Sequence, residues 1–255
     1  MRRFLTVILF SLFCILGVVV WTWFTLPDVT RINDCIVTSM HRVQLCPTQS
    51  RYAPLRTVSP HVINAVVVSE DASFFWHDGF DINEIVDSAK KNWQKGEWAR
   101  GGSTITQQLA KNVYLTPEKS LLRKLREAMI SIQLERYLTK HQILEKYLNV
   151  VEFGPGLYGI KDAARHYFRK PPLDLNILES VFLAFLLPDP KTYARSFDAG
   201  KLSTFAQKRV RALVERLHRF KKITAFQRDV AIDSIAAFPW HRLDADTQFI
   251  LRASG

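Results

Sequence analysis

An uncharged, almost wholly apolar stretch runs from Phe4 to Pro27 near the start of this 255-residue chain. As a helix rising about 1.5 Å per residue, it would cross the roughly 30 Å hydrocarbon core of a bilayer. It is too long and too uniform for a buried globular helix. Arg2 and Arg3 precede it, and a basic flank favours a cytoplasmic N-terminus. We therefore expect residues 1–27 to form a cytoplasmic tip and a single transmembrane anchor, with the remaining chain outside the cytoplasm.

A cleaved signal peptide would share part of this pattern, but its apolar region is usually only about 7–15 residues long. No small-x-small site precedes Pro27, so we interpret the stretch as an uncleaved anchor. Cys14 lies within it, directly after the bulky Phe13, which argues against a lipoprotein cleavage site. We expect Cys14 to face lipid.

Cys35 and Cys46 lie just beyond the anchor. Exported compartments permit disulfides, and a bond between these two residues would close a short loop. Two free thiols are the alternative. In either case we expect a structural role for the pair.

The chain carries a net charge of +11, and without Arg2 and Arg3 the exported part would still carry +9. A strongly basic protein favours an anionic partner, such as a phospholipid surface, nucleic acid or a phosphorylated substrate. Because an exported protein rarely meets nucleic acid, we expect membrane lipid or a lipid phosphate.

An acidic and aromatic stretch from Ser69 to Gly79 follows the apolar run 62–68. Glu70 and Asp71 sit where the apolar run ends. A carboxylate at the rim of an apolar wall is partly desolvated, so its pKa rises and it can act as a base or an acid. The alternative is a capped helix end beside an ordinary aromatic core.

Two glycines precede a Ser/Thr-rich helix start in the segment from Arg100 to Asn112. Exposed backbone N–H groups at a helix N-terminus form a ready anion site. The glycine spacing excludes a P-loop. Ser103 or Thr104 could instead serve only as a helix cap, although the paired glutamines and Lys111 add a polar face beyond what a cap requires.

Thr116-Pro117-Glu118 predicts the start of the next helix, with Thr116 as its cap. On that helix Arg123 and Glu127 are four residues apart. The simplest interpretation is a surface ion pair worth about half a kcal/mol. The functional alternative is a carboxylate kept ionised among cations beside a phosphate site.

Helical patterns dominate the remaining chain, and strand-like alternation is sparse. We assign residues 28–60 to a linker and lead-in, 61–222 to the main domain and 223–255 to a C-terminal helix and tail. Helices are predicted at 61–72, 81–93, 140–149, 161–168 and 175–187, with a polar loop at 94–99 and a glycine-rich tight loop at 152–160.

The predicted helix at 175–187 is the most apolar and is the candidate for the central core. Residues 200–222 carry eight Lys or Arg and one apolar stripe. That helix either lies on anionic lipid or packs against the domain with a solvated basic face.

Four ordered motifs resemble those of the peptidoglycan glycosyltransferases, glycosyltransferase family 51. They are Glu70-Asp71-x-x-Phe74-x-x-His77-x-Gly79, Gly101-Gly102-Ser103-Thr104-Ile105-Thr106-Gln107-Gln108, Arg123-Lys124-x-x-Glu127 and Lys140-x-x-Ile143-Leu144-Glu145-x-Tyr147-Leu148-Asn149. The resemblance covers roughly residues 50–220. It implies a mainly α, lysozyme-like glycosyltransferase domain behind a single N-terminal transmembrane helix.

The resemblance also implies a reaction, the polymerisation of lipid II, a disaccharide-peptide carried on a polyprenyl pyrophosphate. Glu70 would be the general base that deprotonates the acceptor sugar 4-hydroxyl, which attacks the donor anomeric carbon with inversion. Glu127 would be a second carboxylate that organises cations or helps to hold a divalent metal. The positions that match substrate-binding residues of the family are Ser103, Gln107, Lys111, Lys119, Arg126 and, from a weaker fifth motif, Arg209.

The family further implies membrane lipid, lipid II, the growing glycan strand and other cell-wall synthesis proteins as partners, and a place in the inner (cytoplasmic) membrane. No metal-ligating cluster stands out in the sequence, so we expect no tightly bound cofactor and at most Mg²⁺ or Mn²⁺ arriving with the substrate pyrophosphate. A lysozyme-like hydrolase would share two carboxylates and a helical fold. A non-catalytic membrane scaffold is the other alternative, against which both Glu70 and Glu127 argue.

Overall fold

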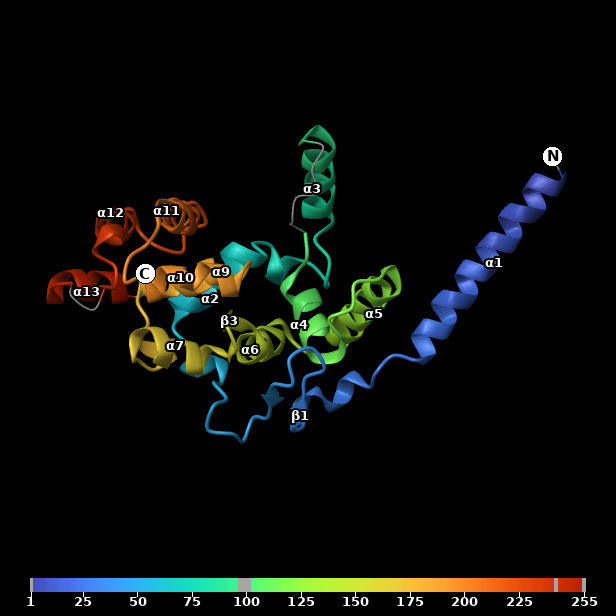
Figure 1. Cartoon of the computed structure of the whole chain (residues 1–255), viewed down its shortest axis with the longest axis horizontal. Coiled ribbons are helices and arrows are strands. Elements are labelled where there is room, and N and C mark those ends of the chain that lie inside the picture. The colour runs from blue at the N-terminus through green and yellow to red at the C-terminus, as the bar shows by residue number, and fades with distance from the viewer. Residues whose placement is uncertain (1, 96–101, 241–242, 254–255) are drawn as a thin grey trace.

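The computed structural model of the chain describes residues 2–95, 102–240 and 243–253, and these are mostly helical (Figure 1). The helices are α1 (Arg2–Phe24), α2 (Pro60–Glu70), α3 (Ile82–Lys95), α4 (Ile105–Tyr114), α5 (Leu121–Tyr137), α6 (Lys140–Val150), α7 (Ile160–Phe168), α8 (Ile177–Leu186), α9 (Pro190–Tyr193), α10 (Arg195–Asp198), α11 (Thr204–Arg219), α12 (Ala225–Ser234) and α13 (Ala245–Arg252). Short 3-10 helices are η1 (Val29–Asn33), η2 (Leu55–Thr57), η3 (Phe74–Trp76), η4 (Pro172–Asp174) and η5 (Ile235–Ala237). The described strands form two small antiparallel hairpins, β1 (Ile36–Val37) with β2 (Gln44–Leu45) and β3 (Glu152–Gly154) with β4 (Leu157–Tyr158). The mainly α fold expected from the sequence is confirmed.

Helix α1 extends away from the rest of the molecule toward the N-terminus (Figure 1). Its segment Phe4–Phe24 has a mean hydropathy of 2.7 and, apart from the buried Thr22, is not covered by protein. It is the one helix in the described part of the chain that is long and apolar enough to cross a membrane. It fits a single-pass membrane anchor, because an apolar helix left uncovered by protein needs lipid around it.

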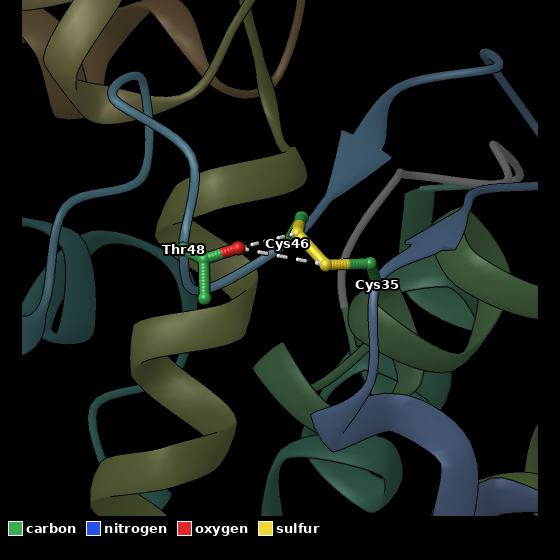
Figure 2. Close-up of a disulfide and its surroundings, with 3 residues drawn as sticks. All are labelled: Cys35, Cys46 and Thr48. Carbon is green, nitrogen blue, oxygen red and sulfur yellow. Dashed lines mark hydrogen bonds between the residues drawn. A yellow bond between two sulfur atoms is a disulfide. The ribbon is translucent and has the colours of Figure 1, made fainter.

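Cys35 and Cys46 form a disulfide that ties the two strands of the first hairpin together (Figure 2). The hydroxyl of Thr48 lies 3.2 Å from the sulfur of Cys46, beside the bond. The disulfide prediction is confirmed, and the free-thiol alternative is wrong.

The segment at residues 28–60 is more than a linker. Ile32, Leu45 and Tyr52 are buried in the same core as the helices. The backbone N–H of Ala53 donates to Oδ1 of Asn149 at 2.8 Å, and Nδ2 of Asn149 donates back to the carbonyl of Ala53 at 2.9 Å. This lead-in is therefore packed against α6, although the domain boundaries at 60 and 222 stay predictions.

The core is built around α8, all of whose residues are buried. Asn176 and Glu179 cap its N-terminus by a reciprocal pair of hydrogen bonds. Helices α2 and α11 pack against α8, and α4 packs against α5 and α6. The central role predicted for this apolar helix is confirmed.

Helix α11 packs against the domain through its apolar stripe. Val210, Leu213, Val214 and Leu217 are buried, and the basic residues of the helix point mostly outward. Phe205 is the exception in the stripe and is exposed. The structure therefore favours a packed helix with a solvated basic face.

One predicted helix start is wrong, and one segment predicted as a tail contains a helix. Helix α5 begins at Leu121 and not at Thr116, because Ser120 supplies the cap by accepting a hydrogen bond from the N–H of Arg123 at 3.1 Å. The expected tail contains a further helix, α13, capped by Asp244 and anchored by the buried Leu251. Each of these helices begins after a residue whose side chain accepts a hydrogen bond from the backbone N–H three residues later.

Helix α3 projects from the domain (Figure 1) and runs on to Lys95, so the start of the loop predicted at 94–99 is helical. Residues 96–101 lie outside the described residues. Ile82, Ile85 and Val86 lie on one face of this helix, and all three are exposed.

The second hairpin confirms the tight loop predicted at 152–160. Gly159 has a φ of +84°, and a Cβ added to it would lie 3.0 Å from the carbonyl oxygen of Asn149. Glycine is therefore needed here because the backbone of α6 approaches closely.

We expect reduction of the Cys35–Cys46 disulfide to lower the free energy of unfolding by about 2–3 kcal/mol, because the bond closes a loop that the unfolded chain must otherwise sample freely. Melting of the detergent-solubilised protein with and without reductant measures the effect. The Cys35→Ser/Cys46→Ser double variant should melt at the reduced temperature in both conditions, and Cys14→Ser should behave like the parent. An unchanged melting temperature on verified reduction would contradict the prediction.

Candidate active site

Glu70 is the last residue of α2, at the rim of the core. Ser59 caps the start of the helix and Pro60 occupies its first turn, so the helix is fixed in register from its beginning. Val66, Val67 and Val68 are buried against the core, which leaves Glu70 partly buried at the edge of an apolar wall. The predicted position of this carboxylate, at the end of the apolar run, is confirmed.

Two side chains donate hydrogen bonds to Glu70. Nε2 of Gln108 lies 2.9 Å from Oε2, and the hydroxyl of Ser69 lies 3.4 Å from Oε1. Burial raises the pKa of Glu70 above its ordinary value, while Gln108, Ser69 and the charge of Lys111 act against the shift and the charge of Asp71 adds to it. The site therefore holds a carboxylate with raised basicity and a defined orientation.

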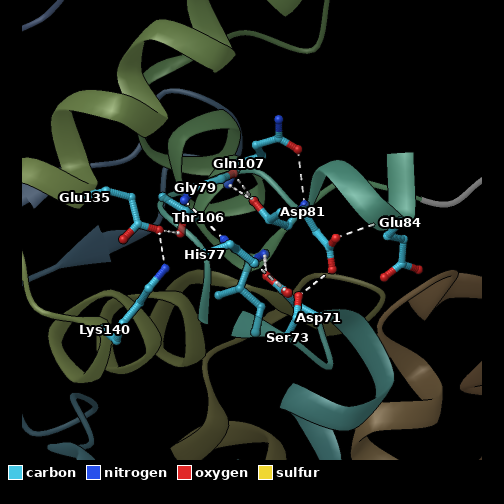
Figure 3. A network of polar contacts seen from close by, with 12 residues as sticks. Asp71, Ser73, His77, Gly79, Asp81, Glu84, Thr106, Gln107, Glu135 and Lys140 are labelled. Carbon is cyan, nitrogen blue, oxygen red and sulfur yellow. Dashed lines mark hydrogen bonds and ion pairs between the residues drawn. The ribbon is translucent and has the colours of Figure 1, made fainter. Parts of the chain in front are cut away.

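Asp71, the neighbour of Glu70, is buried and joins three segments (Figure 3). Its Oδ2 accepts from the N–H of Ile105 at the start of α4, at 3.0 Å, and its Oδ1 lies 2.9 Å from Nε2 of His77. The N–H of Gly79 donates to Nδ1 of His77 at 3.1 Å. Because Nδ1 accepts, Nε2 carries the proton and donates to Asp71. This bridge fixes the end of α2 against the start of α4.

Glu135, which was not predicted as a site residue, forms a second, partly buried anchor for the same loop (Figure 3). Its Oε1 accepts from the hydroxyl of Thr106 at 2.5 Å and from Nζ of Lys140 at 2.7 Å. Gly79 packs beside it with a φ of +90°, and an added Cβ would lie 3.2 Å from the Cγ of Glu135. The glycine of the acidic motif is thus required both by its backbone angle and by this close contact.

The N-terminus of α4 is closed by its own cap. Thr104 accepts from the N–H of Gln107, and Oε1 of Gln107 accepts from the N–H of Thr104. Ser103 is exposed, and Nζ of Lys124 lies 3.4 Å from its hydroxyl. Gln107 is therefore engaged by the cap, and Gln108, which we did not predict as a site residue, faces Glu70 instead.

Glu127 is a buried carboxylate held by cations, with only 2% of the residue exposed. Nη1 of Arg123 donates to Oε2 at 2.9 Å, and the ammonium of Lys124 pairs with Oε1. The interpretation of Arg123 and Glu127 as a surface ion pair is wrong, because burial removes most of the solvent from it. A buried carboxylate with both oxygens paired to cations organises positive charge around itself.

Lys111 on α4 lies in the electrostatic field of both carboxylates. Its pKa is lowered from the ordinary lysine value, chiefly because burial disfavours the charged ammonium. The negative charges of Glu127 and Glu70 oppose this shift, and the positive charges of Arg123 and Lys124 add to it. This lysine therefore connects the Glu70 region with the cationic group on α5.

The remaining predicted residues are dispersed. Nη2 of Arg126 donates to the hydroxyl of Thr25 at 3.2 Å, and its guanidinium lies 5.9 Å from the ring centroid of Trp21. Arg126 therefore faces the C-terminal end of the anchor helix α1. Lys119 is exposed in the segment before α5. The structure does not bring these two residues to Glu70.

A cleft of about 120 Å³ opens between α11 and the end of α2. Its lining includes Glu70, Arg209 and Arg216, with Ser69, Phe185, Pro188, Ala212 and Leu213. The pKa of Arg216 is lowered, mainly by burial, with Glu84 and Glu70 among the charges that oppose the shift and Arg219 and Arg209 adding to it. Arg216 is not among the site residues predicted from the sequence, although it lies seven residues after Arg209 and hence on the same helix face.

No group of three or more His, Cys, Asp or Glu side chains that could hold a metal occurs in the parts of the chain that the structure describes. Both oxygens of Glu127 are paired with cations, so this carboxylate does not fit a resident metal site.

Comparison with known proteins supplies the family. A sequence model of the transglycosylase family matches residues 38–218. A protein of Nitrosomonas eutropha named biosynthetic peptidoglycan transglycosylase is 37% identical, over 82% of this chain and 84% of its own length. Proteins of the same name from Dechloromonas aromatica and Nitrosospira multiformis are 39% and 34% identical, over 72% and 78% of this chain and 80% and 85% of theirs.

The family match contains the loop of Glu70, the capped start of α4 and the buried Glu127, and the relatives cover most of the chain. The chain belongs to the transglycosylase family.

Proposed function

We propose that the protein polymerises lipid II into peptidoglycan glycan strands for cell-wall synthesis, as an inverting glycosyltransferase. The observation that carries this proposal is the pairing of a carboxylate of raised basicity, Glu70, with a cationic group organised by the buried Glu127. Lys111 lies within the field of both. A base on one side and fixed positive charge on the other match a transfer in which a hydroxyl is deprotonated and a pyrophosphate departs.

In this reaction Glu70 takes the proton of the acceptor sugar 4-hydroxyl. The acceptor oxygen forms a bond to the donor anomeric carbon, and the bond from that carbon to the pyrophosphate oxygen breaks with inversion. The polyprenyl pyrophosphate leaves with the bonding electron pair. The hydrogen bond from Gln108 holds the carboxylate of Glu70 in one orientation for this step.

Positively charged side chains stabilise the leaving group in this scheme. Lys111, Arg123 and Lys124 carry the charges that would meet the developing negative charge on the pyrophosphate. Fixed cations in a partly dry site stabilise such charge more than water does. Glu127 keeps two of them in place and does not contact the reacting atoms in this scheme.

The other substrate contacts proposed from the sequence have unequal support. Ser103 lies beside Lys124 and extends the pyrophosphate side as a hydrogen-bond donor. Arg209 shares the cleft of Glu70 and is proposed to contact substrate there, together with Arg216. A pyrophosphate role for Arg126 requires its guanidinium to leave Thr25 and Trp21.

Gln107 and Lys119 have no such neighbours. The carboxamide oxygen of Gln107 is engaged by the helix cap, which leaves only its amide nitrogen for substrate. Lys119 is exposed ahead of α5 and would bind substrate only as a surface cation.

We propose that the enzyme has no resident divalent metal, so the scheme contains no step through one; in support, the described residues hold no group of three or more metal-ligating side chains. Mg²⁺ or Mn²⁺ would enter with the pyrophosphate of the substrate.

The anchor supports a place in the inner membrane, with a cytoplasmic N-terminus and the catalytic domain outside. Confining the enzyme and its lipid-linked substrate to one surface raises their effective concentration. The uncovered apolar face of Ile82, Ile85 and Val86 on α3 is suited to membrane lipid. Besides lipid II and the growing strand, other cell-wall synthesis proteins are proposed partners, and nucleic acid is not.

A glycan hydrolase is the competing function. It would need the two carboxylates to flank a glycosidic bond, but both oxygens of Glu127 are paired with cations. Incubation of the solubilised protein with labelled lipid II separates the alternatives. High-mass product digestible by lysozyme supports the polymerase, and cleavage of pre-formed glycan alone would support the hydrolase.

Glu70→Gln should lower the rate of polymerisation by about 10²- to 10⁴-fold, because the amide cannot accept the hydroxyl proton. Binding of lipid II, measured in the same detergent, should remain. Asp229→Asn is the matched carboxylate-to-amide control, since this side chain is exposed and paired only with Arg228. Near-normal turnover by Glu70→Gln would remove Glu70 from the role of base.

The pH dependence of kcat/KM should be bell-shaped. Glu70 acts in its deprotonated form, and its raised pKa moves the acid limb above the ordinary glutamate value of about 4.3. Lys111 acts in its protonated form, and its lowered pKa moves the alkaline limb below the ordinary lysine value of about 10.4. An acid limb at or below the ordinary glutamate value would contradict the assignment of Glu70.

Lys111→Gln should lower kcat by about 10²- to 10³-fold, because it removes charge that is used when the pyrophosphate departs. Lys161→Gln is the control, because this lysine donates only to the carbonyl of Ser50 on another face. Single-turnover kinetics with lipid II measure the effect. A change in KM alone would show that Lys111 contributes only to binding.

A further inference from the structure

A buried tyrosine stands behind the glutamine that contacts the proposed base. The hydroxyl of Tyr147, on α6, lies 3.1 Å from Oε1 of Gln108. Nε2 of Gln108 in turn donates to Oε2 of Glu70 at 2.9 Å. Tyr147 is fully buried, and it does not touch Glu70 through any hydrogen bond of the structure. The three side chains therefore form a line from the core to the rim of the site.

The two ends of the Gln108 amide are chemically different, so its orientation matters. With Nε2 toward Glu70, the amide donates to the carboxylate. The opposite orientation would place the amide oxygen against a carboxylate oxygen, and two acceptors repel. In the observed orientation Oε1 can only accept, so the hydroxyl of Tyr147 must donate to it.

Tyr147 is suited to be a permanent donor. Its pKa is raised well above the ordinary tyrosine value, because the ring is buried and because Glu70 and Asp71 disfavour a phenolate. Its helix packs directly against α4, which carries Gln108. The hydroxyl thus keeps both its proton and its position while Glu70 gains or loses a proton.

We infer that Tyr147 is a positioning residue for the base: its hydroxyl holds the Gln108 amide in the orientation that presents Nε2 to Glu70. This inference rests on the proposed role of Glu70 in the reaction. Without the hydroxyl the amide is free to turn, and the carboxylate loses a constant donor. Loss of a hydrogen bond to the ionised form makes Glu70 harder to deprotonate.

Other charges also act on Glu70 and must stay constant in any test. From the elements around it, these are Asp71 after α2, Asp81 and Glu84 at the start of α3, Lys111 on α4, and Arg209 and Arg216 on α11. Tyr147→Phe alters none of them. A change in the titration of Glu70 in this variant is therefore attributable to the amide of Gln108.

The experiment is an infrared titration of the full-length protein in detergent micelles. The band of the protonated Glu70 carboxyl is identified by its absence in Glu70→Gln. We expect Tyr147→Phe to raise the midpoint of this band by about one pH unit. Gln108→Met should raise it at least as much. Adding Tyr147→Phe to Gln108→Met should change nothing further, because the tyrosine acts only through the glutamine.

Tyr167→Phe is the matched control. Its buried hydroxyl donates to the carbonyl of Phe153 at 2.8 Å, so the variant loses a comparable hydrogen bond away from Gln108. It should lower the melting temperature without moving the Glu70 midpoint. The inference would be overturned if Tyr147→Phe folds and leaves the Glu70 midpoint unchanged. It would also be overturned if the shifts of the two single variants add in the double variant. If Tyr147→Phe does not fold, an unchanged midpoint in Gln108→Met overturns it alone.

Turnover measured on the same samples separates this inference from the proposed function. If the acid limb of kcat/KM moves with the infrared midpoint, both stand. If the midpoint moves and the acid limb does not, Tyr147 positions Glu70 but Glu70 is not the base. If Glu70→Gln is inactive and Tyr147→Phe leaves the midpoint in place, the base assignment stands and the positioning role of Tyr147 falls.

Discussion

The site depends on the buried carboxylate of Asp71. One of its oxygens accepts a hydrogen bond from a backbone N–H of α4, and the other accepts one from the imidazole of His77. Separating a buried carboxylate from its hydrogen-bond partners costs several kcal/mol, because the groups left behind stay buried without a hydrogen bond. The end of α2 therefore cannot move relative to α4. Glu70 and Gln108, one on each helix, keep their distance as a consequence.

The fixed position of α2 depends on its packing in the core. The uninterrupted apolar helix α8 packs against α2 and α11, so the two elements that line the Glu70 cleft share one buried support. Helix α4 has a separate support in α6, which carries Tyr147. Glu70 thus lies where the helices packed on α8 meet the pair formed by α4 and α6. A carboxylate in that position loses water on one side without losing its access to the cleft on the other.

Local patterns in the sequence predict the elements that carry local signals. The apolar run before Glu70 and the anchor at Phe4–Phe24 are both short-range features, and the structure has both of them. The family resemblance was also visible from ordered motifs. The start of α5 was mistaken because a Thr-Pro-Glu sequence looks like a helix start, whereas Ser120 supplies the actual cap.

Contacts between distant segments could not be predicted in the same way. Adjacent glutamines point in different directions on a helix, and only the cap formed with Thr104 shows that Gln107 is engaged and Gln108 faces Glu70. Arg126 and Lys124 are two residues apart, yet one faces the anchor and the other Glu127. The partners that decide their roles come from elsewhere in the fold, and spacing along one helix does not contain that information.

The buried Glu127 explains how a site can be strongly cationic and still fold. Two cations placed close together repel, and a carboxylate between them offsets that repulsion and fixes their geometry. With Lys111 nearby, the group still carries more positive than negative charge. Under the proposed function, this group is the one that meets the multiply charged pyrophosphate. That arrangement is of little use for hydrolysing a neutral glycosidic bond, and it is what a departing pyrophosphate requires.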